Sequence, residues 1–311
     1  MTELHTAIDE YLAMRRGLGF KLAAAGRWLP DFATYLHDQG STHITVASAL
    51  AWATGPAPRN PSLIATRLGT VRQFTLHHKV VDPATEVPPE DLVLAPRKRI
   101  PPHLFSRDDV AALVAATSSL QPPFRAATYA AFIGMLAVTG LRSGEALRLD
   151  RTDVDLDSGV LTVERTKFGK TREVPLHPST VAALADYDRT RQRAFPGVPG
   201  FFANAKGTRL YAPDIYKAFA ALVETTGIKA NPGARRPRPH DLRHSFAVET
   251  LTGWYRDGQD VEARLPMLST YLGHLEPAMT YWYLSATPEL LALAARRLET
   301  DGQEMDGEVD R

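Results

Sequence analysis

The sequence predicts a mainly helical protein of two domains, with a small antiparallel β-sheet in the second domain. Apolar residues recur at helical spacing in most of the 311-residue chain. A proline-rich segment, residues 86–102, interrupts this pattern and reads as a linker. Two short β-branched runs occur only after that segment. We therefore expect domains at residues 1–85 and 103–298, and a disordered acidic tail at residues 299–311.

The first expected domain consists of helices. Helical spacing of apolar residues marks one helix around residues 8–12 and a second around residues 28–36. A third helix should begin after Thr45, and a fourth should run over residues 61–78. No strand pattern stands out in this part of the sequence.

The linker at residues 86–102 is basic as well as proline-rich. It contains Arg97, Lys98 and Arg99. Prolines disfavour a helix there. A basic, extended linker can lie along a phosphate backbone, although a solvated spacer explains the same composition.

The second expected domain begins with a helix capped by Ser106. A buried helix should follow over residues 124–138. Two β-branched runs, residues 160–163 and 172–176, flank a cationic turn and predict a hairpin. Helices should continue to about residue 298.

Composition excludes several classes of site. The chain has no cysteine, so disulfides, thiolate metal sites and a cysteine nucleophile are excluded, which fits a reducing cytosol. The most apolar stretch, residues 126–138, is too short to span a bilayer, and the N-terminus lacks a signal-peptide pattern. We therefore expect a cytoplasmic protein with no membrane partner.

Net charge by itself does not indicate a nucleic-acid partner. The total is only +1, partly because the last residues are acidic. Local clusters carry more information. One such stretch, residues 229–243, contains Arg235, Arg236 and Arg238, which either contact phosphates or belong to a solvated loop.

Four short segments combine residues that can bind an anion. In the first, residues 139–147, Gly140 breaks the apolar helix, and Arg142 and Glu145 follow. If Ser143 opens a new helix, the Arg142 guanidinium and the backbone amides face one anion. A surface Arg–Glu pair at a helix start explains this segment equally well.

The second segment, residues 165–172, is a hairpin tip crowded with cations. Lys167, Lys170 and Arg172 lie in it. Such a tip suits a phosphate backbone or the edge of a DNA groove. A soluble turn is the alternative.

The third segment, residues 240–247, places His240 and Arg243 three residues apart, on one face of a helix. Together they can neutralise charge that develops on a phosphoryl group. The alternative is a capped helix start with an incidental histidine. His240 and His244 lack the acidic or thiol companions of a zinc pattern, so we expect no metal.

The fourth segment ends a short helix at Gly273 and continues with His274. Tyr283 follows nine residues after that histidine. Taken alone, these residues could be a core histidine and a packed aromatic stripe.

The order and spacing of the four segments resemble the tyrosine recombinases, or phage-type integrases. The resemblance covers residues 102–298, whereas residues 1–85 are similar to the family's core-binding domain only in size and helicity. It implies a two-domain DNA clamp. The family's first motif, T-G-L-R with an acid three residues on, matches Arg142 and Glu145, and its hairpin lysine matches Lys167. Its H-x-x-R motif matches His240 and Arg243. Its L-G-H motif matches His274, and its nucleophile matches Tyr283. Spacing favours Tyr283 over Tyr281 as the nucleophile, and the family pattern favours Lys167 over Lys170.

The resemblance also implies a mechanism. Tyr283 attacks a DNA phosphodiester, and a 3′-phosphotyrosine forms without metal, cofactor or ATP. His240 serves as the base, Lys167 protonates the departing 5′-oxygen, and His274 hydrogen-bonds the phosphate. Arg142 and Arg243 hold the non-bridging oxygens, and Glu145 orients a neighbouring side chain.

The implied partner is double-stranded DNA at a specific recombination site. A homotetramer, with a dimer on each site, and accessory DNA-bending factors would complete the assembly. DNA contacts are expected from the basic clusters, namely Arg97, Lys98, Arg99, Lys170, Arg172, Arg235, Arg236 and Arg238. Two alternatives remain, a type IB topoisomerase and a DNA-binding regulator with an inactive site.

Overall fold

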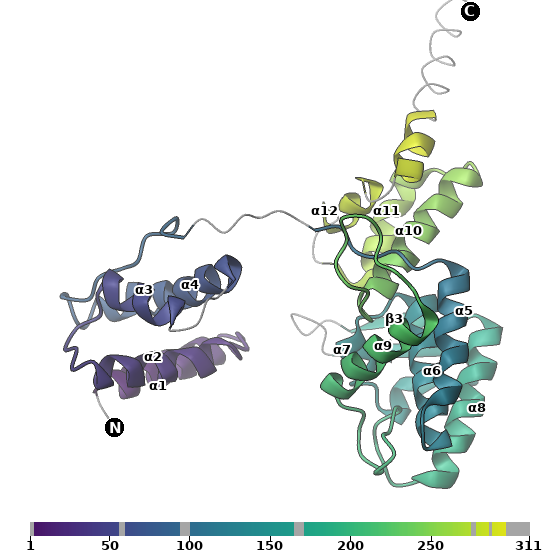
Figure 1. Cartoon of the computed structure of the whole chain (residues 1–311), viewed down its shortest axis with the longest axis horizontal. Coiled ribbons are helices and arrows are strands. Elements are labelled where there is room, and N and C mark those ends of the chain that lie inside the picture. The colour runs from purple at the N-terminus through teal and green to yellow at the C-terminus, as the bar shows by residue number, and fades with distance from the viewer. Residues whose placement is uncertain are drawn as a thin grey trace, which may run out of the picture. The chain divides into compact units, whose positions relative to one another are not determined.

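The computed structural model describes residues 3–55, 60–93, 100–164, 171–274, 278–285 and 288–296. The chain divides into two compact units, Met1–Arg99 (unit 1) and Ile100–Arg311 (unit 2). The predicted mainly helical fold with a small antiparallel sheet is confirmed (Figure 1). Among the residues described, no helix has both the length and the apolar character needed to cross a membrane.

Unit 1 forms its helices where the apolar spacing predicts them. They are α1 (Glu3–Gly17), α2 (Ala25–Asp38), α3 (Val46–Thr54) and α4 (Pro61–His78). Thr45 caps α3, because its hydroxyl accepts from the Ser48 amide while the Ser48 hydroxyl accepts from the Thr45 amide. Asn60 caps α4, whose first residue is a proline. Local capping chemistry thus sets both helix starts.

The core of unit 1 is apolar with one buried cation at its edge. Phe32, Val71 and Phe74 are fully buried at the centre. The Arg67 guanidinium carbon lies 3.7 Å from the Trp52 ring centroid, and its Nη2 donates to the Trp52 carbonyl at 3.2 Å. The aromatic face and the carbonyl thus stabilise a charge that burial would otherwise disfavour.

The first half of the expected linker packs on unit 1. The Glu86 amide donates to the Ile44 carbonyl at 2.8 Å, and Arg72 Nη1 donates to the Pro88 carbonyl at 2.7 Å. Leu92 also packs against the core of this unit. The basic cluster at residues 97–99 lies outside the described residues.

In unit 2, helix α6 packs against three other long helices, and a fourth, α9, packs against α5. Figure 1 shows α5, α6 and α8 side by side, and α10 also contacts α6. Two single 3₁₀ turns, η1 (Thr117–Ser119) and η2 (Arg151–Asp153), connect elements of this unit. The long helices are α5 (Arg107–Ala116), α6 (Pro123–Thr139), α8 (Pro178–Ala194), α9 (Ala212–Thr226) and α10 (Asp241–Arg256).

The ends of α5 and α6 follow their sequence signals. Ser106 caps α5 by accepting from the Asp109 amide, as predicted. Gly140 ends α6 with φ +60°, in the left-handed region. A Cβ at Gly140 would lie 2.5 Å from a ring carbon of Phe246, so only glycine fits there. The chain can therefore turn sharply from α6 into the segment that carries Arg142.

The sheet of unit 2 has the strand order β1-β2-β3 and is antiparallel throughout. Strands β2 (Val160–Val163) and β3 (Arg172–Pro175) form the predicted hairpin, with Val163 opposite Arg172. The two-residue strand β1 (Val154–Asp155) was too short to predict from its sequence. Residues 165–170, at the turn, lie outside the described residues.

The C-terminal elements form a second core in unit 2. Helices α10 and α11 (Val261–Leu272) and the 3₁₀ turn η3 (Trp282–Ser285) contribute to it, and the short helix α12 (Ala278–Tyr281) contacts α11 and η3. Residues 288–296 are also helical, and Leu290 is fully buried in this core. The short helix α7 (Ser143–Ala146) packs against α6.

Candidate active site

Glu145 is buried between two guanidiniums. Arg142 precedes α7, and its Nη1 lies 2.8 Å from Glu145 Oε1, while its backbone amide donates to Oε2 at 3.1 Å. Arg172 Nη2, from β3, lies 2.8 Å from Oε2. Burial alone would raise the pKa of Glu145, but Arg172 and Arg142 outweigh it and lower the pKa to about 2. The carboxylate is therefore ionised and fixes both arginines.

Arg172 was expected to contact DNA, because it lies in the cationic hairpin. In the structure its donors instead bind groups of the protein. Its side chain is only 11% exposed, and its donors reach Glu145 and the Tyr271 carbonyl, at 2.8 Å from Nε. The alternation of side chains along a strand predicts the inward direction of the Arg172 side chain. Arg172 lies two residues before the buried Val174, so both point to the same face of the sheet.

Three consecutive carbonyls at the C-terminal end of α11 accept from three arginines. The Tyr271 carbonyl accepts from Arg172, the Leu272 carbonyl from Arg243 at 2.6 Å, and the Gly273 carbonyl from Arg142 at 3.0 Å. A helix C-terminus exposes such carbonyls and carries partial negative charge, which favours cations there. The arginines thus gather around the residue that follows, His274.

Gly273 makes this approach possible. It adopts φ +65°, and a Cβ there would lie 2.8 Å from Arg172 Nη1. Glycine both ends α11 and leaves room for the guanidinium.

Arg243 lies on α10, one helical turn after His240 at the start of that helix. Its side chain is nearly fully buried, and its Nη1 donates to the Gly140 carbonyl at 2.8 Å. Burial, followed by the charge of Arg142, lowers the pKa of Arg243 to about 10, so it stays charged at neutral pH. The turn at Gly140 and the end of α11 therefore hold one guanidinium between them.

Tyr283 is buried beside two histidines. Its side chain is 2% exposed, and its hydroxyl lies 3.1 Å from His244 Nδ1. The ring of His274 stacks near it at a centroid distance of 6.1 Å, and His274 Nδ1 lies 2.7 Å from the Thr280 hydroxyl. Tyr281 is 50% exposed, so the two tyrosines differ sharply in environment.

The histidines of this cluster are neutral at pH 7. Burial, then Arg243, lowers the pKa of His240. Burial, then Arg243 and Arg142, lowers the pKa of His274 to about 4. Burial also raises the pKa of Tyr283, whereas Arg243 and Arg142 act in the opposite direction. Among the described side chains around Glu145, the guanidiniums of Arg142, Arg172 and Arg243 outnumber the carboxylate, and this excess of positive charge suits a phosphate oxyanion.

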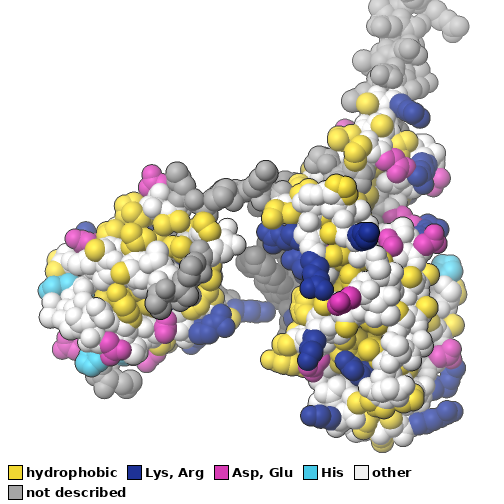
Figure 2. Space-filling model, in the orientation of Figure 1, with side chains coloured by type: hydrophobic (Ala, Val, Ile, Leu, Met, Phe, Trp, Pro, Cys, Tyr) yellow, Lys and Arg dark blue, Asp and Glu magenta, His cyan; other side chains and the backbone are white. Residues whose placement is uncertain are grey.

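The remaining residues that were expected to contact DNA or to act in catalysis fall partly outside the described residues and partly on the surface. Lys167 and Lys170 lie outside the described residues. Arg235 and Arg236 are exposed. Arg238 is half-exposed, and its backbone amide donates to Asp241 at 2.8 Å. Figure 2 shows Lys and Arg side chains on the visible face of unit 2 between α12 and α9.

His244 is a residue of the cluster that the sequence pattern did not single out as functional. The available signal was its spacing, because residues four apart share a helix face and His240 lies four residues earlier. In the part of the chain that the structure describes, no three histidine, aspartate or glutamate side chains form a group that could hold a metal ion.

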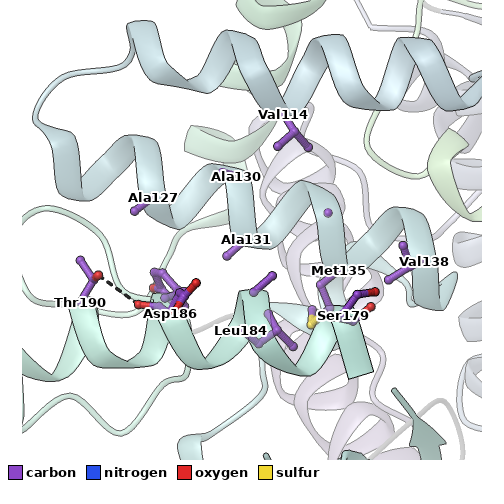
Figure 3. Close-up of a pocket in the computed structure, with 14 residues that line it drawn as sticks. Val114, Ala127, Ala130, Ala131, Met135, Val138, Ser179, Leu184, Asp186 and Thr190 are labelled. Atoms are coloured by element: carbon purple, nitrogen blue, oxygen red, sulfur yellow. Dashed lines mark hydrogen bonds between the residues drawn. The ribbon is translucent and has the colours of Figure 1, made fainter. Parts of the chain in front are cut away.

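A separate apolar groove of about 440 Å³ lies between α6 and α8 and contains none of the expected site residues. Small side chains such as Ala127 and Ala131 line it, with Leu184 across from them (Figure 3). Its only charged lining residue is Asp186. This chemistry does not suit a phosphodiester.

Comparisons with known proteins identify the class. The model of the phage integrase family matches residues 104–289. A Sinorhizobium fredii protein that carries the name integrase/recombinase y4rB is 45% identical over 309 residues, which cover 96% of this chain and 98% of that protein. The chain therefore belongs to the phage integrase family, and it is a site-specific tyrosine recombinase. The tyrosine recombinase XerD of Caulobacter vibrioides is 29% identical and covers 92% of both chains.

Solved structures agree in fold. The integrase of transposon Tn1549, bound to transposon right end DNA, matches with a TM-score of 0.65 at 16% identity, over 94% of this chain and 98% of that one. The XerH site-specific recombinase, bound to a palindromic difH substrate, matches with a TM-score of 0.63 at 19% identity, over 88% of this chain and 78% of that one. The relatives are recombinases and integrases, so neither the topoisomerase nor the inactive regulator is favoured.

Proposed function

We propose that this recombinase cleaves and rejoins double-stranded DNA at a specific site through a 3′-phosphotyrosine bond to Tyr283. The observation that carries the proposal is the convergence of Arg142, Arg243 and His274 at the end of α11, beside the buried Tyr283. These residues come from separate parts of the chain, and their charges match one phosphodiester.

The reaction conserves the phosphoester bond. The Tyr283 oxygen bonds to phosphorus as the bond to the 5′-oxygen breaks. The phenol proton passes to His240, and Lys167 gives a proton to the departing 5′-oxygen. A 5′-hydroxyl later attacks the phosphotyrosine and restores the phosphodiester, so ATP is not consumed.

The two arginines stabilise the pentacoordinate state. A guanidinium has five N–H donors in a planar fork. The carbonyl and carboxylate contacts of Arg142 and Arg243 fix each fork in place before DNA arrives. Groups held in advance need no reorganisation when charge develops on the phosphate.

The histidines begin the reaction neutral, which suits their proposed roles. A neutral His240 can accept the phenol proton. His274 would hydrogen-bond a non-bridging oxygen, and the bond between its Nδ1 and the Thr280 hydroxyl orients the ring. An incoming phosphate would raise the pKa of both histidines by adding negative charge.

We further propose that the protein works on DNA as a homotetramer, with a dimer on each site and DNA-bending accessory factors. In that assembly, the exposed face of the helical residues 288–296, which includes Leu291, would pack on a neighbouring protomer, while Leu290 stays in the core of its own unit. DNA would lie in a clamp formed by a core-binding domain at residues 1–85 and a catalytic domain at residues 103–298. Arg97, Lys98, Arg99, Lys170, Arg235, Arg236 and Arg238 would contact its backbone.

A nicked suicide substrate tests the chemistry. DNA from the sequence flanking the gene would be screened for sites that trap the protein as a covalent adduct on denaturing gels. We expect an adduct with the wild type and with Tyr281→Phe, and none with Tyr283→Phe. An adduct that survives Tyr283→Phe but not Tyr281→Phe would overturn the assignment of the nucleophile.

A further inference from the structure

His244 is the histidine that the Tyr283 hydroxyl reaches in the described part of the cluster, with 3.1 Å between Nδ1 and Oη. We propose that His244 is a positioning residue that holds the Tyr283 phenol in its buried place before DNA is bound. This inference rests on the proposed function, because it names the residue that positions the proposed nucleophile, Tyr283.

Ring contacts fix His244 on several sides. Its ring meets that of His240 edge-on at 5.0 Å between centroids, and that of Trp282 edge-on at 5.6 Å. The Tyr283 ring lies 5.5 Å away. A side chain held in this way can fix the direction of a hydrogen bond at little further entropic cost.

The chemistry of His244 fits a hydrogen-bond acceptor better than a base. Burial, then His240 and Arg243, lowers its pKa to about 3, so the ring is neutral. A neutral imidazole has one acceptor nitrogen and one N–H. With Nδ1 accepting from the phenol, the proton resides on Nε2. So weakly basic a ring can accept the hydrogen bond of the phenol and orient the hydroxyl without taking its proton.

The position also places the phenol in a cationic field. Arg243 and Arg142 both favour the ionised form of Tyr283. His244 thus holds a neutral phenol at a point where guanidiniums stabilise the phenolate that forms during attack. Arg243 also reaches the hydroxyl, so loss of the His244 bond would remove one of two partners that direct it. The attack would then slow more than DNA binding weakens.

Two substitutions separate positioning from packing. His244→Asn keeps a polar atom at the branch position of Nδ1, whereas His244→Leu keeps the volume and removes the acceptor. We expect single-turnover adduct formation on the suicide substrate to slow by about tenfold in His244→Leu and by less than about threefold in His244→Asn, since one hydrogen bond is lost. DNA affinity should stay within about twofold in both variants.

Three outcomes would overturn the proposal. One is a wild-type rate in His244→Leu, and another is an equal loss in both variants. The third is a change in the pH profile: a base at position 244 would make His244→Leu lose the acidic limb, whereas a positioning residue lowers the rate at every pH.

A spectroscopic measurement on the DNA-free protein tests the hydrogen bond between His244 and Tyr283 without relying on DNA cleavage. The inference and the proposed function can therefore fail independently. In protein labelled with ¹³C at the tyrosine ring carbon that bears the hydroxyl, the Tyr283 signal is identified by its absence from Tyr283→Phe. We expect that signal to move in His244→Leu and to stay near its wild-type position in His244→Asn. An unmoved signal in His244→Leu would overturn the positioning role, whereas the absence of any wild-type adduct would overturn only the proposed function.

Discussion

Arg67 in unit 1 and the arginines around Glu145 in unit 2 differ in how their positive charge is balanced. In unit 1, Arg67 lies over the Trp52 ring at the edge of the apolar core and 3.6 Å from the Asp31 carboxylate. In unit 2, Arg142 and Arg172 both pair with the buried Glu145 carboxylate, and the buried Arg243 lies close to them. One carboxylate balances the one cation in unit 1, whereas several guanidiniums around one carboxylate in unit 2 remain short of negative charge. Unit 2 thus maintains a charge imbalance that an incoming anion can offset.

The largest effect is expected from a substitution in the apolar core of unit 1. Phe74→Ala removes a fully buried ring from unit 1 and should cost about 3–5 kcal/mol of local stability. Hydrogen exchange, measured peptide by peptide, should lose protection in α1 to α4. Phe20→Ala, at a site that is 48% exposed, is the matched control and should change little. A loss that is equally large in unit 2 would contradict the division of the chain into two units.

The next effect concerns the guanidinium fork of Arg243. Arg243→Lys keeps the charge but cannot donate to the Gly140 and Leu272 carbonyls while also facing a phosphate. Single-turnover cleavage should fall by about 10²–10³-fold, or about 2.7–4 kcal/mol. Arg107→Lys, on a side chain that is 87% exposed, should retain activity. Near-wild-type cleavage by Arg243→Lys would show that charge alone is sufficient.

A third substitution removes the Glu145 carboxylate, which pairs with Arg142 and Arg172. Glu145→Gln leaves Arg142 and Arg172 without their counter-charge and should lower the free energy of unfolding by about 3 kcal/mol. Urea denaturation would measure the loss. Glu249→Gln, which breaks an exposed pair with Arg107, should cost under about 1 kcal/mol. If the two substitutions cost the same, burial does not strengthen the Glu145 pairs.

The smallest expected effect is a pH dependence of stability. Burial and the nearby arginines lower the pKa of His274 in the folded protein to about 4, below the ordinary histidine value of 6.5, so at intermediate pH the ring takes up a proton on unfolding. Its contribution to stability is therefore complete above pH 6.5 and is lost as the pH falls from 6.5 towards 4. Urea midpoints at several pH values should decline less steeply in His274→Gln than in the wild type. Parallel declines would exclude this linkage.

The sequence predicted the architecture well because its signals are local. Apolar spacing located helices α1 to α4 of unit 1. Thr45 and Ser106 capped the helices that were expected to follow them, and the β-branched runs paired as a hairpin. Motif spacing also brought Arg142, Arg243 and His274 to notice as one group. Their catalytic roles, like those of the basic clusters, remain predictions.

The role of Arg172 could not be assigned from a cationic turn alone. Whether a strand residue points to solvent or to the core depends on what covers each face of the sheet. Here the end of α11 lies against β3, so Arg172 faces the Tyr271 carbonyl instead of solvent. The contact between His244 and Tyr283 likewise joins two segments that are distant in sequence.

By itself, the sequence indicated where the helices of unit 1, helices α5 and α6 and the β2–β3 hairpin lie, which recombinase motifs the chain carries, and that Gly140 and Gly273 permit tight turns. Capping, periodicity and backbone freedom act over a few residues, so their outcome can be read directly from the chain. Only the tertiary structure decided that three guanidiniums meet at the end of α11 and that the Tyr283 hydroxyl lies within hydrogen-bonding distance of His244. Those contacts depend on how distant segments pack, because the side chains must be both desolvated and brought within hydrogen-bonding distance.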